Sequence, residues 1–447
     1  MGTVTGTPAQ GLWAATLGFF AGFAAVALFG STARGFAQAM ELGPMAVGLL
    51  VAAPALSGSL LRIPFSAWVD TTGGRRPFIV LLGLSVLGLA GLTAVVAVLY
   101  PGRLTASWYP LTLALGVLSG CGIATFSVGI SQVAYWFPQA AQGRALAVFG
   151  GVGNLAPGLF SLLLPLAVAT LGLRDSYLAW LVLLAAGTAG YVLLGRNAPY
   201  FQLRARGKSA VEARRAAAAL GQELFPAGRL ADSLRESART WRTWALVLVY
   251  FTTFGGFVAL TAWLPTYWVS FHGCSAVTAG ALAALYSLLA STIRIAGGVM
   301  ADNLEEGGEN TAILALLITL VGALVMTGSQ QFELAVPGVL LLAVGMGVCN
   351  AAVFKIVPQA VPQAVGGAAG WVGGLGAFGG FAVPPMLAFA VGDLGPRGYA
   401  IGFIVFVFLA LSSLTAVWVL KYALRPARPA GHVAVEGQPP MWSAHGP

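Results

Sequence analysis

Long apolar stretches separated by short polar segments run through almost the whole chain. Gly, Pro and charged clusters divide it into twelve stretches, each near the 20 or so residues that a helix needs to cross a bilayer. We place them at residues 12–31, 46–67, 77–99, 110–133, 145–168, 175–195, 243–268, 276–299, 311–328, 334–354, 366–390 and 398–421. The pattern predicts an all-α integral membrane protein with twelve transmembrane helices in the lipid bilayer.

The longest polar stretch divides these helices into six and six. We therefore expect an N-terminal six-helix half over residues 1–195, a linker over 196–242, a C-terminal six-helix half over 243–421 and a tail over 422–447. Within the linker, Ala, Arg and Glu gather at 209–220 and 230–241, which predicts two short surface helices. The proline-containing tail is expected to be largely disordered.

Composition and charge support this interpretation. Hydrophobic residues make up 58% of the 447 residues and charged ones 8%, whereas about a quarter of a soluble domain is charged. Seventeen Lys and Arg residues fall in the linker, the tail and the loops on the linker side, against four in the other loops. Because basic loops stay in the cytoplasm, we expect both termini to be cytoplasmic in a multi-pass protein of the inner (cytoplasmic) membrane. The net charge of +9 then reflects topology, and no nucleic-acid partner is expected.

Two arginines lie inside predicted spans. Arg62 and Arg294 are each followed eight residues later by an aspartate, Asp70 and Asp302. Eight helical residues rise about 12 Å, so aspartates at the membrane boundary would place both guanidinium groups near the midplane. A charged guanidinium at that depth costs several kcal/mol, and no Asp, Glu or His falls near the middle of a span to offset it. The pair therefore predicts a site for a small anion in a central cavity.

The two halves repeat a second feature, a glycine cluster on the fifth span of each half. It reads Gly150-Gly151-Val152-Gly153-Asn154 in the first half and Gly373-Gly374-Leu375-Gly376-Ala377 in the second. Duplicated halves are typical of carriers that rock around a site at the midplane. Close helix packing and proximity to substrate explain these glycines equally well.

A loop motif resembles the major facilitator superfamily. The segment Ser66-Ala67-Trp68-Val69-Asp70-Thr71-Thr72-Gly73-Gly74-Arg75-Arg76 is similar to the family's motif between spans two and three, with Ser66 in place of its first glycine. A weaker copy ends at Asp302. The resemblance implies the major facilitator fold and assigns a gating role to Asp70, Arg75, Arg76 and Asp302.

The arginines and glycine clusters together resemble the nitrate/nitrite porter family, across essentially all twelve spans. The resemblance makes Gly150, Gly151, Gly153, Gly373, Gly374 and Gly376 signature glycines. It implies substrate contacts from residues on both halves, which are Arg62, Arg294, Asn154, Tyr250, Phe126 and Phe254. For the aromatic residues taken alone, ordinary core packing is the simpler explanation. Asn350, near the start of a similar polar segment on span ten, receives no ligand role.

Nitrate and nitrite suit this set chemically. Both are planar monovalent anions that a guanidinium can bind through two hydrogen bonds, and flat rings can flank them. Two facing guanidinium groups repel each other until an anion binds, which favours exchange of nitrate for nitrite in nitrate assimilation. Nitrate/proton symport is the alternative, with Lys355 as a titratable candidate. A carrier for another anion, such as an organophosphate, oxalate or formate, and a membrane sensor also remain open. We expect no enzyme activity, cofactor or metal, and a monomeric carrier.

Overall fold

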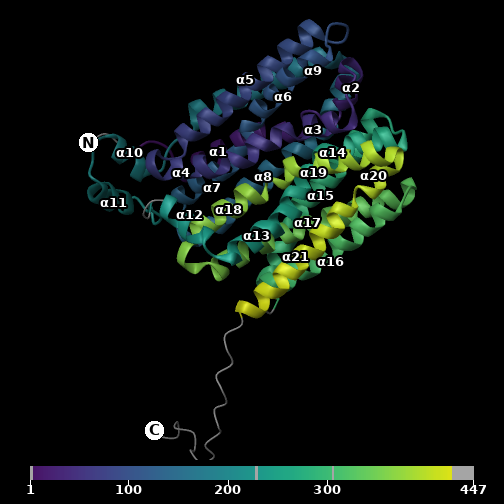
Figure 1. Cartoon of the computed structure of the whole chain (residues 1–447). Helices are drawn as coiled ribbons and strands as arrows, with labels where there is room; N and C mark the ends of the chain where they lie inside the picture. The colour runs from purple at the N-terminus through teal and green to yellow at the C-terminus, as the bar shows by residue number, and fades with distance from the viewer. Residues whose placement is uncertain (1–3, 227–229, 305–306, 425–447) are drawn as a thin grey trace, which may run out of the picture.

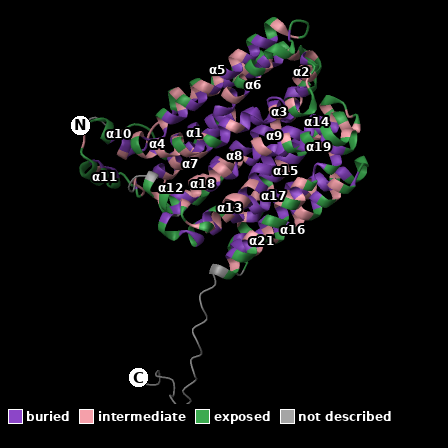
Figure 2. Ribbon diagram, in the orientation of Figure 1, coloured by how far each residue is buried: buried purple, intermediate pink, exposed green. Residues whose placement is uncertain are grey.

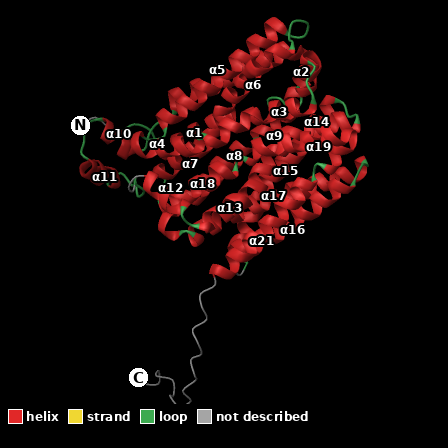
Figure 3. Cartoon of the chain, in the orientation of Figure 1, coloured by secondary structure: helices red, strands yellow, loops and turns green. Residues whose placement is uncertain are grey.

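The computed structural model describes residues 4–226, 230–304 and 307–424, and those residues form helices and loops without a strand (Figure 3). The disorder predicted for the tail concerns residues that lie mostly outside this description. Figure 1 shows the two halves side by side, with the linker helices and the N-terminus at one end of the helical bundle. We call this the linker end and the opposite one, where α2 and α20 lie, the far end.

The first half consists of nine α-helices with short 3₁₀ segments between some of them. Their bounds are α1 Pro8–Phe23, α2 Ala33–Met40, α3 Pro44–Leu60, α4 Arg62–Thr72, α5 Arg75–Leu99, α6 Tyr109–Ser119, α7 Thr125–Trp136, α8 Gln139–Asn154 and α9 Ala156–Leu194. The linker holds α10 Pro199–Ala205, α11 Ala210–Ala218 and α12 Leu230–Ala238. The last two confirm the surface helices that composition predicted.

The second half follows the same plan with two π-helical turns, η4 Phe251–Gly255 and η6 Val372–Gly376, inside its spans. Its α-helices are α13 Trp241–Tyr250, α14 Gly256–His272, α15 Ala276–Asn303, α16 Gly307–Gly328, α17 Phe332–Ala360, α18 Val365–Trp371, α19 Gly379–Leu394, α20 Gly398–Ile401 and α21 Ile404–Leu424.

The described residues contain eleven continuous helical stretches that are long and apolar enough to cross a membrane. One of them, Ala141–Leu194, has 54 residues, about 80 Å of helix, which is far more than one crossing needs. It reverses at Gly172, whose φ of +78° is readily adopted only by glycine. The stretch is therefore two spans, and the prediction of twelve is confirmed.

Burial separates the interior from the lipid-facing surface. Figure 2 shows buried residues concentrated along the centre of the bundle, with exposed and half-buried residues on its outer faces. Leucines and phenylalanines lie on those faces, for example Leu183, which is 59% exposed, and Phe408, which is 63% exposed. Such apolar exposure is suited to lipid.

The halves meet tightly at the far end. The Thr266 hydroxyl on α14 donates to the carbonyl of Gly30 at 3.3 Å. A Cβ placed on Gly48 of α3 would lie 2.5 Å from the Cβ of Ala388 on α19. Gly280 on α15 similarly abuts the backbone of Ser161 on α9. These small residues let helices of opposite halves approach closely.

Candidate functional site

Arg62 lies in the middle of the bundle, where α3 gives way to α4, with 2% of its surface exposed. Its Nε donates to the carbonyl of Gly58 at 3.0 Å, within the same span. Its Nη1 donates to the carbonyl of Gly373 at 3.1 Å, on the opposite half. Its Nη2 is buried without a hydrogen-bond partner. The guanidinium is thus fixed at two corners and has donors to spare at the third.

Two phenylalanine rings flank this guanidinium. Cζ of Arg62 lies 5.1 Å from the ring centroid of Phe126, on α7, and 5.0 Å from that of Phe254, on η4. The two rings stack with centroids 6.2 Å apart and planes inclined by 20°. The sequence-based prediction placed both rings beside one planar ligand, and the structure brings them together around Arg62.

Arg294 and Tyr250 approach the same point from the second half. Arg294, on α15, is half-buried and close enough to Arg62 and to the Tyr250 hydroxyl for their charges and dipoles to interact. Tyr250 is fully buried, and its ring stacks on Phe254 at 4.9 Å. Its hydroxyl makes no contact of standard hydrogen-bond geometry, so its contact with Arg294 is a loose one.

Asn154 completes the predicted set at the junction of the halves. Its side chain is buried and its Oδ1 has no partner. Its backbone carbonyl accepts a hydrogen bond at 3.0 Å from the hydroxyl of Ser291, which precedes Arg294 by three residues on α15. All six predicted ligands therefore come from the central region of the bundle, and three of them carry polar atoms without partners.

The signature glycines fall into two groups. A Cβ on Gly153 would lie 2.0 Å from the Phe19 ring, one on Gly374 would lie 2.6 Å from Ile63, and one on Gly376 would lie 2.8 Å from Tyr250. By contrast, a Cβ on any of the remaining three would have no atom within 4 Å, and these are Gly150, Gly151 and Gly373. Close packing explains the first group, and open space in the bundle adjoins the second.

No carboxylate pairs with either site arginine among the described residues, and the ion pairs Arg174–Asp175 and Lys355–Asp302 involve neither of them. The same residues hold no cluster of His, Cys, Asp and Glu that could bind a metal. An uncompensated pair of guanidinium groups creates a positive potential in a medium of low dielectric constant. Such a site attracts an anion.

The predicted gate residues lie at the linker end. The Asp70 carboxylate accepts a hydrogen bond at 2.6 Å from the Tyr135 hydroxyl. Arg75 donates to the carbonyls of Gly195 at 2.9 Å and Val192 at 2.8 Å, and Arg76 is exposed. All of these contacts stay within the first half.

In the second half, Nζ of Lys355 lies 2.7 Å from a carboxylate oxygen of Asp302 and also donates to the carbonyl of Ala301. The sequence indicated Lys355 only as a titratable candidate and did not predict this pair.

Two features of the site were not foreseen. The carbonyl of Gly373 holds Arg62, and an aromatic wall of Phe19 and Phe149 backs Phe126, with ring centroids 5.2 and 6.2 Å from it. The amide N–H groups of Ala377 and Phe378, which follow the π-helical turn η6, both donate to the carbonyl of Leu375. A π-helical turn often marks a functional position. A run of glycines hints at such irregularity, but nothing in the sequence identifies the bonded carbonyl.

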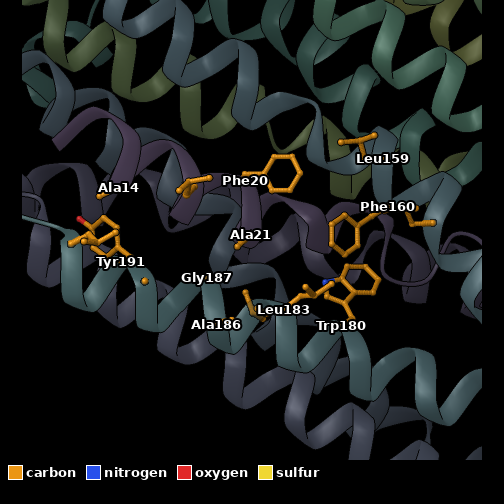
Figure 4. A pocket seen from close by; sticks show the side chains of 15 residues that line it. Ala14, Phe20, Ala21, Leu159, Phe160, Trp180, Leu183, Ala186, Gly187 and Tyr191 are labelled. Atoms are coloured by element: carbon orange, nitrogen blue, oxygen red, sulfur yellow. The ribbon is translucent and has the colours of Figure 1, made fainter. Parts of the chain in front are cut away.

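A groove of about 420 Å³ on the first half lies away from this site, between α1 and α9 (Figure 4). Leu17, Phe20, Phe160 and Trp180 are among its apolar lining side chains. It contains no charged residue, so it is unsuited to an anion.

The comparisons with known proteins agree with the geometry. The family model described as the Major Facilitator Superfamily matches residues 12–384. The D-xylose-proton symporter has a similar solved structure, with a TM-score of 0.69, 14% identity, and coverage of 90% of this chain and 96% of that one. At that identity the likeness shows the fold alone, which is the major facilitator fold predicted from the loop motif.

Curated relatives narrow the family. A probable nitrate/nitrite antiporter, NarK1 of Thermus thermophilus, is 31% identical over 437 residues, covering 91% of this chain and 90% of that protein. A probable nitrate/nitrite transporter, NarK2 of Mycobacterium tuberculosis, is 30% identical over 389 residues, covering 87% and 90%. A nitrite extrusion protein of Bacillus subtilis is 28% identical over 407 residues, covering 90% and 92%. The chain therefore belongs to the nitrate/nitrite porter family of the major facilitator superfamily.

Proposed function

We propose that this protein carries nitrate and nitrite across the cytoplasmic membrane by alternating access and exchanges one for the other. The observation that carries the proposal is the buried Arg62 guanidinium, whose Cζ lies 5.1 Å from the Phe126 ring centroid and 5.0 Å from that of Phe254, with Nη2 unbonded and no carboxylate partner. The names of the relatives, among them a probable nitrate/nitrite antiporter and a nitrite extrusion protein, support the same substrates.

The proposed recognition follows from the shape and charge of these anions. Nη2 of Arg62 offers two N–H donors, and Arg294 can offer a second fork from the opposite half. The Tyr250 hydroxyl and the Asn154 amide add neutral donors. The Tyr250 hydroxyl makes no standard hydrogen bond, and the Asn154 Oδ1 has no partner, so turning its N–H₂ toward the anion breaks no bond at that oxygen. The two phenylalanine rings favour a flat ion over a tetrahedral phosphate.

The ring spacing supports coupling between binding and movement. Stacked atoms prefer separations near 3.5 Å, so a planar ion between two rings needs centroids about 7 Å apart. The observed distance is 6.2 Å, with Phe126 on the first half and Phe254 on the second. An entering anion then pushes the rings apart by about 1 Å and shifts one half relative to the other.

Charge explains why exchange is favoured. Without an anion, two positive groups of opposite halves oppose closure, and a bound anion offsets part of that repulsion. The carrier should therefore change conformation mainly when loaded. The basic linker implies that the linker end faces the cytoplasm. There we propose that Asp70, Arg75, Arg76 and Asp302 control access.

Labelled nitrate uptake into proteoliposomes tests the proposal. Three preparations are compared: vesicles loaded with nitrite, vesicles without substrate, and empty vesicles under an inward proton gradient. We expect uptake only in the first. Uptake driven by the gradient would establish symport instead and make the Lys355–Asp302 pair the first place to look for a titrating group. No uptake in any preparation would rule out a nitrate carrier and favour another anion or a sensor.

A further inference from the structure

Asn350 is a buried amide that nothing in the fold explains. It lies on α17 with 3% of its surface exposed, and its Oδ1 makes no hydrogen bond. Burying an amide without a partner is unfavourable, and most buried polar side chains in proteins are bonded. An amide left in this condition suggests that its partner is a ligand.

The neighbours of Asn350 place it at the depth of the anion site. One turn further along α17, Phe354 packs edge-on against the Tyr250 ring, with centroids 5.1 Å apart. Cys349, which directly precedes Asn350, contacts Thr253, and Thr253 is next to Phe254 on η4. Asn350 thus lies at the level spanned by Tyr250 and Phe254.

The adjoining helix gives the same depth independently. A Cβ on Gly297 of α15 would lie 2.6 Å from the carbonyl oxygen of Val348, so the two helices touch there. Gly347 likewise abuts Ala290 and Ile293. Arg294 is within one turn of these contacts on α15, and Asn350 is within one turn of them on α17.

The internal repeat shows what is missing from the second half. In the first glycine cluster the residue after the last glycine is Asn154, whereas the matching position of the second cluster is Ala377. The second half therefore has no amide on span eleven to match the one on span five. Asn350, on the neighbouring tenth span, is a buried amide that can take its place.

We propose that Asn350 is a substrate-binding residue whose amide N–H donates to an oxygen of the bound anion from the second half. The assignment rests on the proposed function. The two ends of an amide have the same shape, so rotation of the group presents either N–H₂ or oxygen to the site without repacking. Asn154 and Asn350 then hold the anion from opposite halves, and both approach it near Arg294 on α15.

The test compares Asn350→Ala with the neighbouring Cys349→Ala in purified protein. Nitrate binding is measured as the nitrate concentration that gives half of the maximal thermal stabilisation, and exchange as KM and maximal rate in proteoliposomes. Loss of a hydrogen bond to a charged ligand weakens binding by about tenfold or more. We expect that weakening for Asn350→Ala, with a melting temperature in the absence of nitrate that is unchanged or higher. Cys349→Ala should bind nitrate as the wild type does.

A melting temperature that falls while nitrate affinity stays within twofold of wild type would make Asn350 a structural residue and overturn the assignment. Should Asn350→Ala not fold, the isosteric Asn350→Asp decides, because a carboxylate in the site repels the anion, and wild-type nitrate affinity in that variant would also overturn it. A wild-type protein that neither binds nor exchanges nitrate would overturn the proposed function, and this assignment with it. If the wild type exchanges nitrate and Asn350→Ala binds nitrate with the wild-type affinity, only the assignment of Asn350 is overturned.

Discussion

At the scale of single residues, the chemistry depends on the geometry of one guanidinium. Two nitrogens of Arg62 donate hydrogen bonds to the carbonyls of Gly58 and Gly373. These bonds orient the remaining nitrogen, Nη2. A lysine at this position would keep the charge but could not make both anchoring bonds and still present a fork to the anion. Charge alone therefore does not specify the site.

From this we predict that Arg62→Lys and Arg294→Lys each lower nitrate exchange by about 10- to 100-fold, the cost of one or more hydrogen bonds between charged groups. Exchange is measured in proteoliposomes, with folded yield from size-exclusion chromatography. Arg174→Lys is the control, because the Arg174 side chain is 71% exposed just after the reversal of α9 at Gly172. Near wild-type exchange in either site variant would contradict recognition by paired guanidinium groups.

The Tyr250 hydroxyl offers a prediction in which stability and affinity change in opposite directions. It is buried with only a loose contact to Arg294, so its removal costs the fold little. We expect Tyr250→Phe to keep or raise the melting temperature without nitrate while weakening nitrate binding about tenfold.

The matched control is Tyr191→Phe, because the Tyr191 hydroxyl donates to Gln132 at 2.5 Å inside the first half. This variant should lose thermal stability and keep its nitrate affinity. Equal losses of affinity in both variants would show that the Tyr250 hydroxyl has no special role at the site.

At the scale of elements, the glycines of the signature helices differ in their packing. The sequence explained them equally well by close packing and by proximity to substrate, and the structure shows close packing at only some of the positions. Gly153 receives the Phe19 ring, which is itself confined by Phe23 and Phe149 at centroid distances of 4.9 and 5.1 Å. Gly150, one turn earlier, has no neighbour within 4 Å of a Cβ.

Alanine should therefore act differently at these two positions of one helix. Gly153→Ala overpacks a confined ring, which costs about 1–3 kcal/mol. Gly150→Ala meets no atom and gains helix propensity of up to about 1 kcal/mol. We predict a lower melting temperature for Gly153→Ala and an equal or higher one for Gly150→Ala, measured by thermal unfolding in detergent. Equal destabilisation would mean that both glycines are packed.

Helix positions were largely predictable, because a helix that crosses the lipid bilayer needs a long apolar stretch, and Gly and Pro separate these stretches. Irregular turns within the helices were not predictable. The π-helical turn η4 contains Phe254, and the π-helical turn η6 contains Gly373, whose carbonyl accepts from Arg62. No periodicity in the sequence marks either turn. The sequence also does not show which N–H donors of Arg62 are already hydrogen-bonded within the protein. One of these bonds joins residues more than 300 positions apart.

At the scale of the molecule, the six-plus-six division could be predicted from one polar linker and two repeated motifs. The arrangement of the halves could not, because both conformations of a rocking carrier bury the same helices. In this structure glycines bring the halves together at the far end, where α3 meets α19 at Gly48 and Ala388. Alternating access requires that contact to open.

A disulfide across that contact tests the requirement. In a background without Cys121, Cys274 and Cys349, the pair Gly48→Cys and Ala388→Cys joins the halves, and Gly187→Cys with Ala21→Cys joins two spans of the first half. The Cβ separations are 2.5 and 2.8 Å, so both pairs reach disulfide geometry if the helices part by about 1 Å. We predict that oxidation abolishes exchange in the first pair, that reduction restores it, and that the second pair keeps exchanging nitrate in both states. Full exchange by the oxidised first pair would mean that the far end never opens between α3 and α19, and the substrate would then need another route out of the bundle.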